Sequence, residues 1–492
     1  MTRRDPRILI IGGGPTGLGA AWRLQEIGYT NWALFDAARG PGGLASSVVD
    51  SHGFVWDLGG HVLFSHYEYF DALMEELLGD SWLVHERESW VWMRNRFIPY
   101  PLQQNVWRLP EEDLIMCLNG FLTVHAGERS RSEIETFHDW ILRNFGQGMA
   151  DVFLVPYNEK VWAYHPSALG TGWMGERVAN VNLKRTLENL VRRKDDCTWG
   201  PNATFRFPRQ GGTGAIWKEL CSRLPDNNLS FGMAVTDVSV DERRVWFANG
   251  ASESFDFLIS TLPLDCLLKS LTDAPSLSSL STRFIHSSTH VVGVGIEGET
   301  SPSLSTKSWI YFPEPDLPFY RVTVFSNYSP FNVPEPGRYW SLMAEVSESS
   351  LRPVNPHTVT DQVIEGLTRS GLLPAESRVA SRWHRKLEYG YPTPFLGRDA
   401  LLEEIDPKLC SLGIWSRGRF GAWKYEVSNQ DHSLMQGVES VDRIVFGAEE
   451  ITYRYPDLVN SRKGVGRRPL LQPVINPTIS IPQDRAHRPQ PV

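Results

Sequence analysis

The stretch that decides the fold is ILIIGGGPTG, residues 8–17, near the start of a chain of 492 residues. Residues 8–11 form a continuous apolar run, which is typical of a strand buried on both faces. The glycine-rich turn that follows has the spacing G-x-G-x-x-G and leads into a segment with apolar residues at helical spacing. A second apolar run, residues 32–35, ends at Asp36, which follows Gly17 by 19 residues. Together these features predict a βαβ unit that binds a dinucleotide.

Each part of this unit has a physical role. Gly12 permits the turn, Gly14 lets the backbone approach a pyrophosphate, and Gly17 allows the helix to pack closely on the strand. The helix N-terminus offers free N–H groups and the positive end of its dipole to the phosphates. The alternative, a glycine turn in an unrelated α/β protein, does not account for the acidic residue at the expected spacing. The expected dinucleotide contacts are Gly12, Gly14, Pro15, Thr16, Gly17 and, on the adenosine ribose, Asp36.

Two further glycine pairs distinguish FAD from NAD. They lie in PGGLAS, residues 41–46, and in DLGGH, residues 57–61. A flavin enzyme needs close backbone approach to the isoalloxazine ring as well as to the pyrophosphate, whereas glycines that serve only as turns would explain either pair alone. We therefore expect FAD. These segments add Gly42, Gly43, Leu44, Ala45, Ser46, Gly60 and His61 to the expected cofactor contacts.

A last amphipathic helix is predicted over about residues 431–450. Its apolar face consists of Leu434, Val438, Val441, Val445 and Ala448. Asn429 and the residues that follow it are expected to cap this helix. Its N-terminus, if directed at the flavin pyrimidine edge, would stabilise the negative charge that appears on reduction.

Composition excludes several classes of protein. Hydrophobic residues make up 41% and charged residues 22% of the chain, and the net charge is −8, so a dedicated nucleic-acid binder is not expected. The 5 cysteines contain no C-x-x-C unit, and we expect no disulfide framework and no metal site. Without a signal peptide or a long apolar stretch, a soluble cytoplasmic protein without membrane contact is expected. The sequence does not decide between a monomer and a homo-oligomer.

The rest of the chain divides by pattern. Residues 105–195 have mostly helical periodicity, whereas residues 225–262 and 285–346 contain short β-type runs. Beyond about residue 460 the chain is rich in Arg, Pro and Gln, and this tail is expected to be disordered.

Several long strings in order are shared with one known family. They are GGHVLFSHY (59–67), PYNEKVWA (156–163), GERVA (175–179), GPNATF (200–205), PFYR (318–321), GYPTP (390–394) and WSRGRFG (415–421). On these strings the chain resembles the UDP-galactopyranose mutases, specifically their fungal branch, over roughly residues 7–460. The order and length of the strings make this resemblance more specific than any single motif.

The resemblance implies a mixed α/β fold (α/β with α+β parts): a doubly wound, Rossmann-like FAD-binding domain with a helical insertion domain and an antiparallel β-sheet domain. The FAD-binding domain would be discontinuous, comprising residues 1–85, 200–275 and 410–460. The helical substrate-binding insertion would be residues 105–199. The antiparallel-sheet domain would comprise residues 86–104 and 276–409, and residues 461–492 would be the tail.

The resemblance also implies an isomerase (an intramolecular transferase) that interconverts UDP-galactopyranose and UDP-galactofuranose with no net redox change, for galactofuranose biosynthesis. In this family the reduced flavin is active, its N5 forms a covalent adduct with the sugar, and NADPH or NADH supplies the initial reduction. Arg177 and Arg321 correspond to the two arginines that bind the diphosphate, and His61 to the histidine beside the flavin. An arginine suits the first role because its planar, permanently charged fork matches phosphate oxygens.

Further site residues follow from the resemblance alone. On the substrate side these are Arg87, Tyr100, Gln103, Asn158, Trp162, Asn202, Tyr311, Tyr391, Tyr425 and Asn429. On the flavin side they are Val235, Arg419, Gln430 and Ser433. The chain departs from the family pattern at Leu102, where relatives place an aromatic residue, and at Glu159, where they place an apolar one. We expect the loss of that aromatic face to weaken stacking on uracil, and Leu102→Phe to tighten UDP binding.

Two other functions are compatible with the flavin motif. One is an FAD-dependent oxidoreductase of the amine oxidase or desaturase type, which would need an apolar substrate tunnel rather than paired phosphate arginines. The other is a non-catalytic binding protein like the Rab GDP-dissociation inhibitors, against which the intact glycine motif argues.

Overall fold

A five-stranded parallel sheet forms the base of the molecule. The structure is a computed structural model that describes residues 5–127, 133–180, 182–197 and 203–461. The strand order is β19-β13-β1-β2-β9, with β1 at Ile8–Ile11 in the centre. Its neighbours are β2 (Trp32–Asp36), β13 (Phe257–Ser260), β9 (Leu229–Phe231) and β19 (Ile414–Ser416). Every pairing in it is parallel, as expected when both faces are covered.

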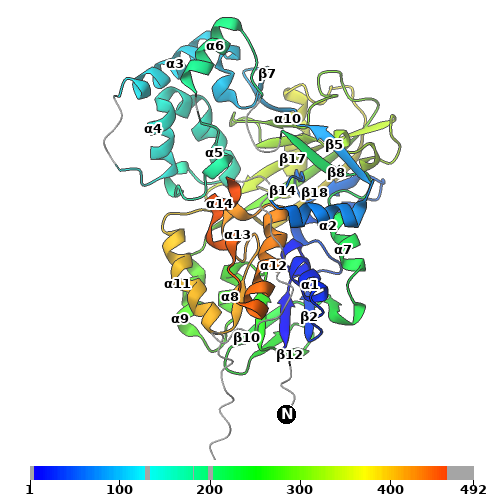
Figure 1. Cartoon of the computed structure of the whole chain (residues 1–492). Coiled ribbons are helices and arrows are strands. Elements are labelled where there is room, and N and C mark those ends of the chain that lie inside the picture. Colours follow the sequence, from blue (N-terminus) through cyan, green and yellow to red (C-terminus); the bar gives the residue numbers. More distant parts are fainter. Residues whose placement is uncertain (1–4, 128–132, 181, 198–202, 462–492) are drawn as a thin grey trace, which may run out of the picture.

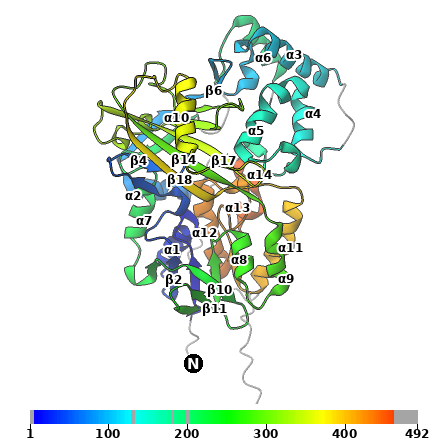
Figure 2. The same cartoon turned by 180° about the vertical axis from the view of Figure 1, so that it is seen from behind.

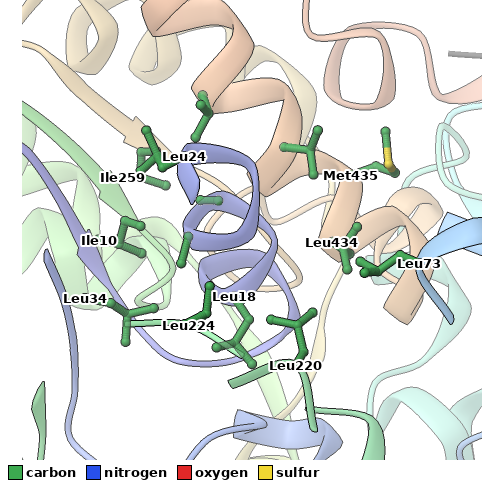
Figure 3. Packing of buried hydrophobic residues seen from close by; sticks show 14 of the residues in the cluster. Ile10, Leu18, Leu24, Leu34, Leu73, Leu220, Leu224, Ile259, Leu434 and Met435 are labelled. Atoms are coloured by element: carbon green, nitrogen blue, oxygen red, sulfur yellow. The ribbon is translucent and has the colours of Figure 1, made fainter. Parts of the chain in front are cut away.

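Helices cover one face of this sheet and mixed elements cover the other. The first face packs against α1 (Pro15–Glu26), α2 (Glu68–Leu78), α7 (Gly214–Ser222) and α12 (Gln430–Phe446). Figure 3 shows Ile10 and Leu34 of the sheet beside Leu18 and Leu24 of α1. The second face carries the small antiparallel sheet β10 (Val235–Ser239), β11 (Arg244–Phe247) and β12 (Ser252–Ser254), with α8 (Leu264–Ser270) and α11 (Arg398–Ser411).

Helices α1 and α12 cross with almost no side chain between them. A methyl group added at Gly437 of α12 would lie 1.9 Å from the Thr16 carbonyl oxygen, and one added at Gly19 would lie 2.5 Å from that of Leu434. The helices are also joined by a buried ion pair, since Arg23 Nε donates to Asp442 Oδ1 at 2.7 Å. The start of α12 is therefore fixed beside the start of α1.

A second, seven-stranded sheet lies above the first (Figures 1 and 2). Its strand order is β18-β14-β17-β16-β15-β6-β7. The bounds are β6 Ser89–Met93, β7 Arg96–Pro99, β14 His286–Glu297, β15 Trp309–Tyr311, β16 Arg321–Val324, β17 Tyr339–Glu348 and β18 Val379–Pro392. The expectation of an antiparallel sheet needs one correction: β6 and β15 pair in parallel. Helix α10 (Val359–Arg369) packs against β14 and β18.

The helical segment forms a separate lobe beside the large sheet (Figure 1). It consists of α3 (Glu111–His125), α4 (Phe137–Met149), α5 (Val155–Trp162) and α6 (Leu183–Arg192). Helix α4 begins with a capping box in which Thr136 and Asp139 exchange hydrogen bonds. The apolar core of the lobe includes Phe121 and Ile141 and continues into Met93 of β6, Ile98 of β7 and Leu102.

The remaining elements are short. They are β3 (Ser47–Val49), β4 (Val55–Asp57), β5 (Trp82–Glu86), β8 (Thr204–Pro208), α9 (Pro275–Ser278), α13 (Ile451–Arg454) and α14 (Pro456–Asn460). Within the described ranges, no helix combines the length and the apolar character needed to cross a bilayer. The predicted disordered tail, apart from Ser461, lies outside the described residues.

The last helix differs from its predicted form in two ways. It ends at Phe446, where Gly447 takes a left-handed conformation with φ of 71°, rather than near residue 450. It is also not amphipathic in its setting, because polar residues such as Gln436 and Glu439 are as buried as Leu434. Leu434, Val438, Val441 and Val445 of the predicted apolar face lie on the helix and Ala448 lies beyond its end, and α1, α2 and the C-terminal segment cover the other faces too.

We predict that Gly437→Ala destabilises the protein by about 1–3 kcal/mol, because the added methyl group overpacks the α1–α12 crossing. Urea unfolding monitored by circular dichroism would measure this loss. Gly40→Ala is the matched control, since a methyl group there meets no atom within 4 Å. Equal stabilities of the two variants would contradict the close packing of α1 on α12.

Candidate active site

A cavity of about 580 Å³ lies where the two sheets and the starts of α1 and α12 meet. We call it the central cavity. Its walls come from the glycine turn after β1, the loop of residues 58–64, strands β14–β18 and the segment 418–433. Its ionisable lining includes four arginines and two acidic residues, so positive charge is in excess: Arg87, Arg177, Arg321, Arg419, Asp36 and Glu345.

The glycine turn forms one end of the central cavity. Gly12 has φ of 105°, and a methyl group on it would lie 1.9 Å from Thr261 Oγ1. Gly14 and Gly43 bring two backbones together, since a methyl group on Gly43 would lie 3.2 Å from the Gly14 Cα. Side chains at these positions would fill the space in front of the α1 N-terminus. The bare backbone and the helix dipole therefore fit the pyrophosphate of FAD.

Asp36 lies at the same end of the cavity. Its Oδ2 accepts a hydrogen bond from the Gly13 N–H at 2.5 Å, and its Oδ1 accepts one from the Ala38 N–H at 2.6 Å. Burial raises the pKa of this carboxyl, and the two N–H donors oppose that rise. Each carboxyl oxygen keeps a second lone pair, so the side chain can still accept a ribose hydroxyl.

The start of α12 forms another part of the wall. Asn429, Gln430 and Ser433 all line the central cavity. Asn429 occupies the N-cap position, but its side chain does not cap the helix as predicted. Instead Asn429 Oδ1 accepts hydrogen bonds from Nη1 and Nη2 of Arg177, each at 3.4 Å. The capping oxygen is thus used to orient an arginine.

Arg177 and Arg419 share a wall of tyrosine rings. Arg177 also donates from Nη2 to the Glu426 carbonyl at 3.0 Å, and its guanidinium lies 4.6 Å from the Tyr425 ring centre. Arg419 donates to Ser428 Oγ and to the Gly390 carbonyl, both at 2.9 Å. It also lies 5.0 Å from the ring centre of Tyr391. These contacts hold two cations side by side without a carboxylate partner among the described residues.

Arg321, by contrast, has a carboxylate partner. It begins β16 and donates from Nε and Nη2 to Glu345 of β17 at 2.7–3.0 Å. Its side chain is 21% exposed and lines the central cavity. Tyr320 completes the group by donating its hydroxyl to Glu345 Oε2 at 2.5 Å.

His61 lies near these cations and is half-buried in the lining. Burial lowers its pKa to about 4, and the charges of Arg419 and Arg321 lower it further against the opposing effect of Glu345. The ring is therefore neutral at neutral pH. Its Nδ1 has no hydrogen-bond partner among the described residues. A neutral imidazole whose Nδ1 has no partner can donate a hydrogen bond to a bound ligand ring, or accept one from it, depending on its tautomer.

Two tyrosines and one arginine form the part of the central cavity nearest the helical lobe. Tyr100 and Tyr311 meet edge to face with ring centres 5.1 Å apart. Arg87 lies beside both, and burial lowers its pKa although both tyrosines oppose this. All three line the central cavity.

Most residues singled out from the sequence line this one cavity. The lining cofactor candidates are Gly12, Gly14, Pro15, Thr16, Asp36, Gly43, Leu44, Ala45, Gly60, His61, Val235, Arg419, Gln430 and Ser433. The lining substrate and catalytic candidates are Arg87, Tyr100, Arg177, Tyr311, Arg321, Tyr391, Tyr425 and Asn429. Gly17, Gly42, Ser46, Gln103, Asn158 and Trp162 are not in the lining, and Asn202 lies outside the described residues.

The candidates outside the lining are held by the protein itself. Gln103 donates to the Ala179 carbonyl at 3.3 Å, and Asn158 donates to that of Leu154 at 2.8 Å. Trp162 lies directly behind the lining, with its ring centre 4.9 Å from that of Tyr425 and 5.6 Å from that of Tyr391. These side chains support the wall rather than form it.

Neither of the two departures from the family pattern is in the cavity lining. Leu102 is 0% exposed and belongs to an apolar cluster against which the lining residues Tyr100 and Tyr311 also pack. The expected effect of an aromatic ring there on uracil stacking stays a prediction. A phenylalanine at this position would have to repack that cluster. Glu159 is exposed on the outside of α5, near Arg352, and does not line the central cavity.

Sequence reasoning missed several lining residues. They include Phe64, Thr261, Tyr320, Glu345 and Tyr389. Phe64 and Tyr320 lie inside strings quoted for the resemblance, so the signal was there. Glu345 lies between the buried residues Ala344 and Val346 of β17, and an acidic residue among buried neighbours is itself a signal.

Comparison with known proteins fits this geometry. Residues 15–330 match the family described as flavin containing amine oxidoreductase. A crystal structure of reduced UDP-galactopyranose mutase superposes with a TM-score of 0.92 at 48% identity, covering 94% of this chain and 99% of that one. A protoporphyrinogen oxidase from Exiguobacterium, described as putative, has a TM-score of 0.66 at 16% identity, covering 90% and 99%, and shares the fold only.

Curated relatives match more weakly. The mitochondrial protoporphyrinogen oxidase of Nicotiana tabacum is 22% identical over 330 residues, which is 57% of this chain and 62% of that one. The chain thus spans about three fifths of the length of this relative. From the profile match and the 48% identity, we conclude that the chain belongs to the flavin-containing amine oxidoreductases and, within them, to the UDP-galactopyranose mutase family.

The depressed pKa of His61 predicts a pH effect on stability. Between about pH 6.5 and pH 4 the unfolded chain binds a proton at His61 that the folded chain does not. The free energy of unfolding should therefore fall on acidification, with His61 contributing on the order of 1–3 kcal/mol of the loss. Urea unfolding at pH 7.0 and 4.5 should show a smaller loss for His61→Gln than for the wild type. Equal losses would contradict a buried neutral histidine.

Proposed function

We propose that this protein is a flavin-dependent isomerase that interconverts UDP-galactopyranose and UDP-galactofuranose. The observation that carries the proposal is that Arg177 and Arg321 line one cavity with the glycine turn that fits a dinucleotide. An oxidase that binds apolar or amine substrates has no use for several arginines in its lining. The 48% identity to a UDP-galactopyranose mutase across nearly the whole chain supports the same activity.

FAD is the cofactor that the cavity fits. Its pyrophosphate would lie on the backbone of Gly12, Gly14 and Gly43 at the α1 N-terminus, and its ribose would bond to Asp36. The N-terminus of α12, at Gln430, would stabilise negative charge on a reduced ring. Reduced FAD would supply the nucleophilic nitrogen that the family resemblance assigns to it, and NADPH or NADH would be the reductant.

The arginines would bind and stabilise the diphosphate. When UDP leaves the sugar, negative charge develops on its β-phosphate, and fixed guanidinium groups stabilise it without reorganisation. Arg177 is already oriented by Asn429 and the Glu426 carbonyl, and Arg321 by Glu345. The hydroxyls of Tyr311, Tyr391 and Tyr425 would add hydrogen bonds. Neutral His61 would contact the flavin ring.

The chain divides into a part that binds substrate and a part that binds flavin. We assign substrate binding to the helical lobe, residues 105–199, together with the sheet segments 86–104 and 276–409. We assign flavin binding to the rest of the described chain. The 5 cysteines are all free, which fits a reducing compartment such as the cytoplasm.

The test is chemical. The purified protein should be yellow and should lose that colour with NADPH or NADH under nitrogen. The reduced protein should then convert UDP-galactofuranose to UDP-galactopyranose, which chromatography separates. A yellow protein that is rapidly reoxidised by air and does not convert either nucleotide sugar would favour an oxidase. A colourless protein that cannot be loaded with FAD would favour a non-catalytic binding protein.

We predict that Arg177→Ala and Arg321→Ala each lower turnover about 10²–10³-fold, because each removes a fixed cation from the leaving diphosphate. Both variants should keep bound flavin, since neither side chain touches the glycine turn. Activity and the absorbance spectrum measure the two effects.

Arg338→Ala provides the control for these variants. Its side chain is 55% exposed and pairs with Glu335 on the surface, so turnover should stay within about twofold of the wild type. Normal turnover in Arg177→Ala would remove that residue from the proposed mechanism.

A further inference from the structure

Glu345 makes more contacts than any role described above requires. It is 2% exposed in the wall of the central cavity. Its Oε1 accepts hydrogen bonds from Arg321 Nε at 3.0 Å, Arg321 Nη2 at 2.7 Å and the Gly60 N–H at 2.8 Å. Its Oε2 accepts from the Tyr320 hydroxyl at 2.5 Å and from Arg321 Nη2 at 2.8 Å. Both oxygens are therefore fully occupied by protein donors.

The Gly60 contact joins this ion pair to a separate loop. Gly60 lies on residues 58–61, between β4 and α2, and precedes His61. A methyl group on Gly60 would lie 2.9 Å from Thr323 Oγ1, 3.1 Å from Glu345 Oε1 and 3.2 Å from Arg321 Cζ. The loop backbone thus rests directly on the ion pair, and a side chain at residue 60 would separate them.

The loop is held at its other end by a second buried carboxylate. Asp431 Oδ2 accepts hydrogen bonds from the backbone N–H of His66 at 3.0 Å and from its Nδ1 at 2.7 Å. Between these two carboxylates, Leu63 exchanges backbone hydrogen bonds with Arg206 of β8 at 3.2 and 2.9 Å, so the segment that carries His61 is held at Gly60, Leu63 and His66. Of the two carboxylates, Glu345 alone is in the lining of the central cavity.

The ion pair also fixes how Arg321 can meet an anion. Nε and Nη2 are taken by Glu345, and Nη1 makes no hydrogen bond with any residue in the described part of the chain. An anion in the cavity would therefore meet Arg321 on its Nη1 side. A carboxylate so close weakens the attraction between Arg321 and an anion, so the pair orients the guanidinium at some loss of affinity.

We propose that Glu345 is a positioning residue that couples the diphosphate arginine Arg321 to the loop carrying His61. A diphosphate that binds Arg321 would hold the same guanidinium that Glu345 holds. If the guanidinium moves on binding, the Glu345 carboxylate moves with it, and so does the Gly60 N–H that is bonded to this carboxylate. This inference rests on the proposed function for the identity of the anion. The coupling between Arg321 and the loop through Glu345 can be tested with UDP alone, without turnover.

The main variant is Glu345→Gln in the FAD-loaded protein. The amide keeps the size of the side chain but carries no charge, so it cannot form an ion pair with the guanidinium. We expect turnover to fall about 30-fold or more, because Arg321 loses its orientation. The dissociation constant for UDP should stay within about threefold of the wild type or become smaller, since a negative charge near the diphosphate is removed. A merely structural role would not separate turnover from affinity in this way.

Hydrogen exchange of the same protein tests the link to the loop. In the wild type, UDP should slow amide exchange in residues 58–62. In Glu345→Gln, exchange there should be faster without UDP, and UDP should no longer slow it. Gly60→Ala is a second variant that removes no charge. The added methyl group crowds the ion pair, and we expect turnover to fall at least about 10-fold, again with little change in UDP affinity.

Glu348→Gln is the matched control. Glu348 lies three residues further along β17 with its side chain on the opposite face, and it is 17% exposed and pairs with His290 at 2.9 Å and Lys386 at 2.7 Å. The substitution removes a comparable carboxylate from the same strand. Turnover, UDP affinity and exchange of residues 58–62 should all stay within about twofold of the wild type.

The outcomes separate this inference from the proposed function. A wild type that binds UDP and shows the exchange effect, but converts neither nucleotide sugar, would refute the proposed activity and leave the coupling supported. Turnover of Glu345→Gln within threefold of the wild type would overturn the positioning role. So would a loss of UDP affinity equal to the loss of turnover, or unchanged exchange of residues 58–62.

Discussion

Direct backbone contact around α1 is the constraint on which the rest of the structure depends. Gly17 rests on the Gly12 carbonyl, where a methyl group would lie 1.7 Å from the oxygen, and Gly19 and Gly437 bring α12 against the other side. Because backbone meets backbone at these glycines, the relative positions of the elements are fixed to within small shifts. Two helix N-termini therefore open into the same cavity, one at the glycine turn and the other at Asn429. The anion-binding character of the cavity follows from that packing before any arginine is considered.

Local patterns predicted the parts of the fold that local physics decides. The ILIIGGGPTG stretch became β1, its turn and α1, because the apolar run, the glycine spacing and the helical periodicity are all properties of the local sequence. The last helix was predicted, but its amphipathic character was not observed, since burial of Gln436 and Glu439 depends on three separate segments covering α12. The parallel pairing of β6 with β15 was also missed. These strands are more than 200 residues apart, and no local pattern encodes such a pairing.

The candidate site divides in the same way. The glycine positions around the dinucleotide end follow from motif spacing, whereas Arg177 and Arg321 came only from the resemblance to a family. Asn429 was expected to cap a helix but orients Arg177 instead, because a side-chain oxygen at an N-cap can serve either donor and tertiary contacts decide which. Leu102, which was singled out from the family pattern, is buried in the apolar cluster behind the lining residues Tyr100 and Tyr311, and its effect on uracil binding stays a prediction. Glu345 was missed because its partners come from β16 and from the loop at Gly60.

The strand order of the parallel sheet has a consequence for biosynthesis. Strand β1 leaves the ribosome first, yet its partner β13 follows about 250 residues later, and β19 closes the edge only at Ile414–Ser416. The hydrophobic N-terminal strands must therefore wait, partly unpaired, while most of the polypeptide is translated. Helix α12, which supplies one wall of the cavity, emerges later still. A chain truncated before residue 430 would lack that wall, and with it the helix N-terminus that faces the cavity.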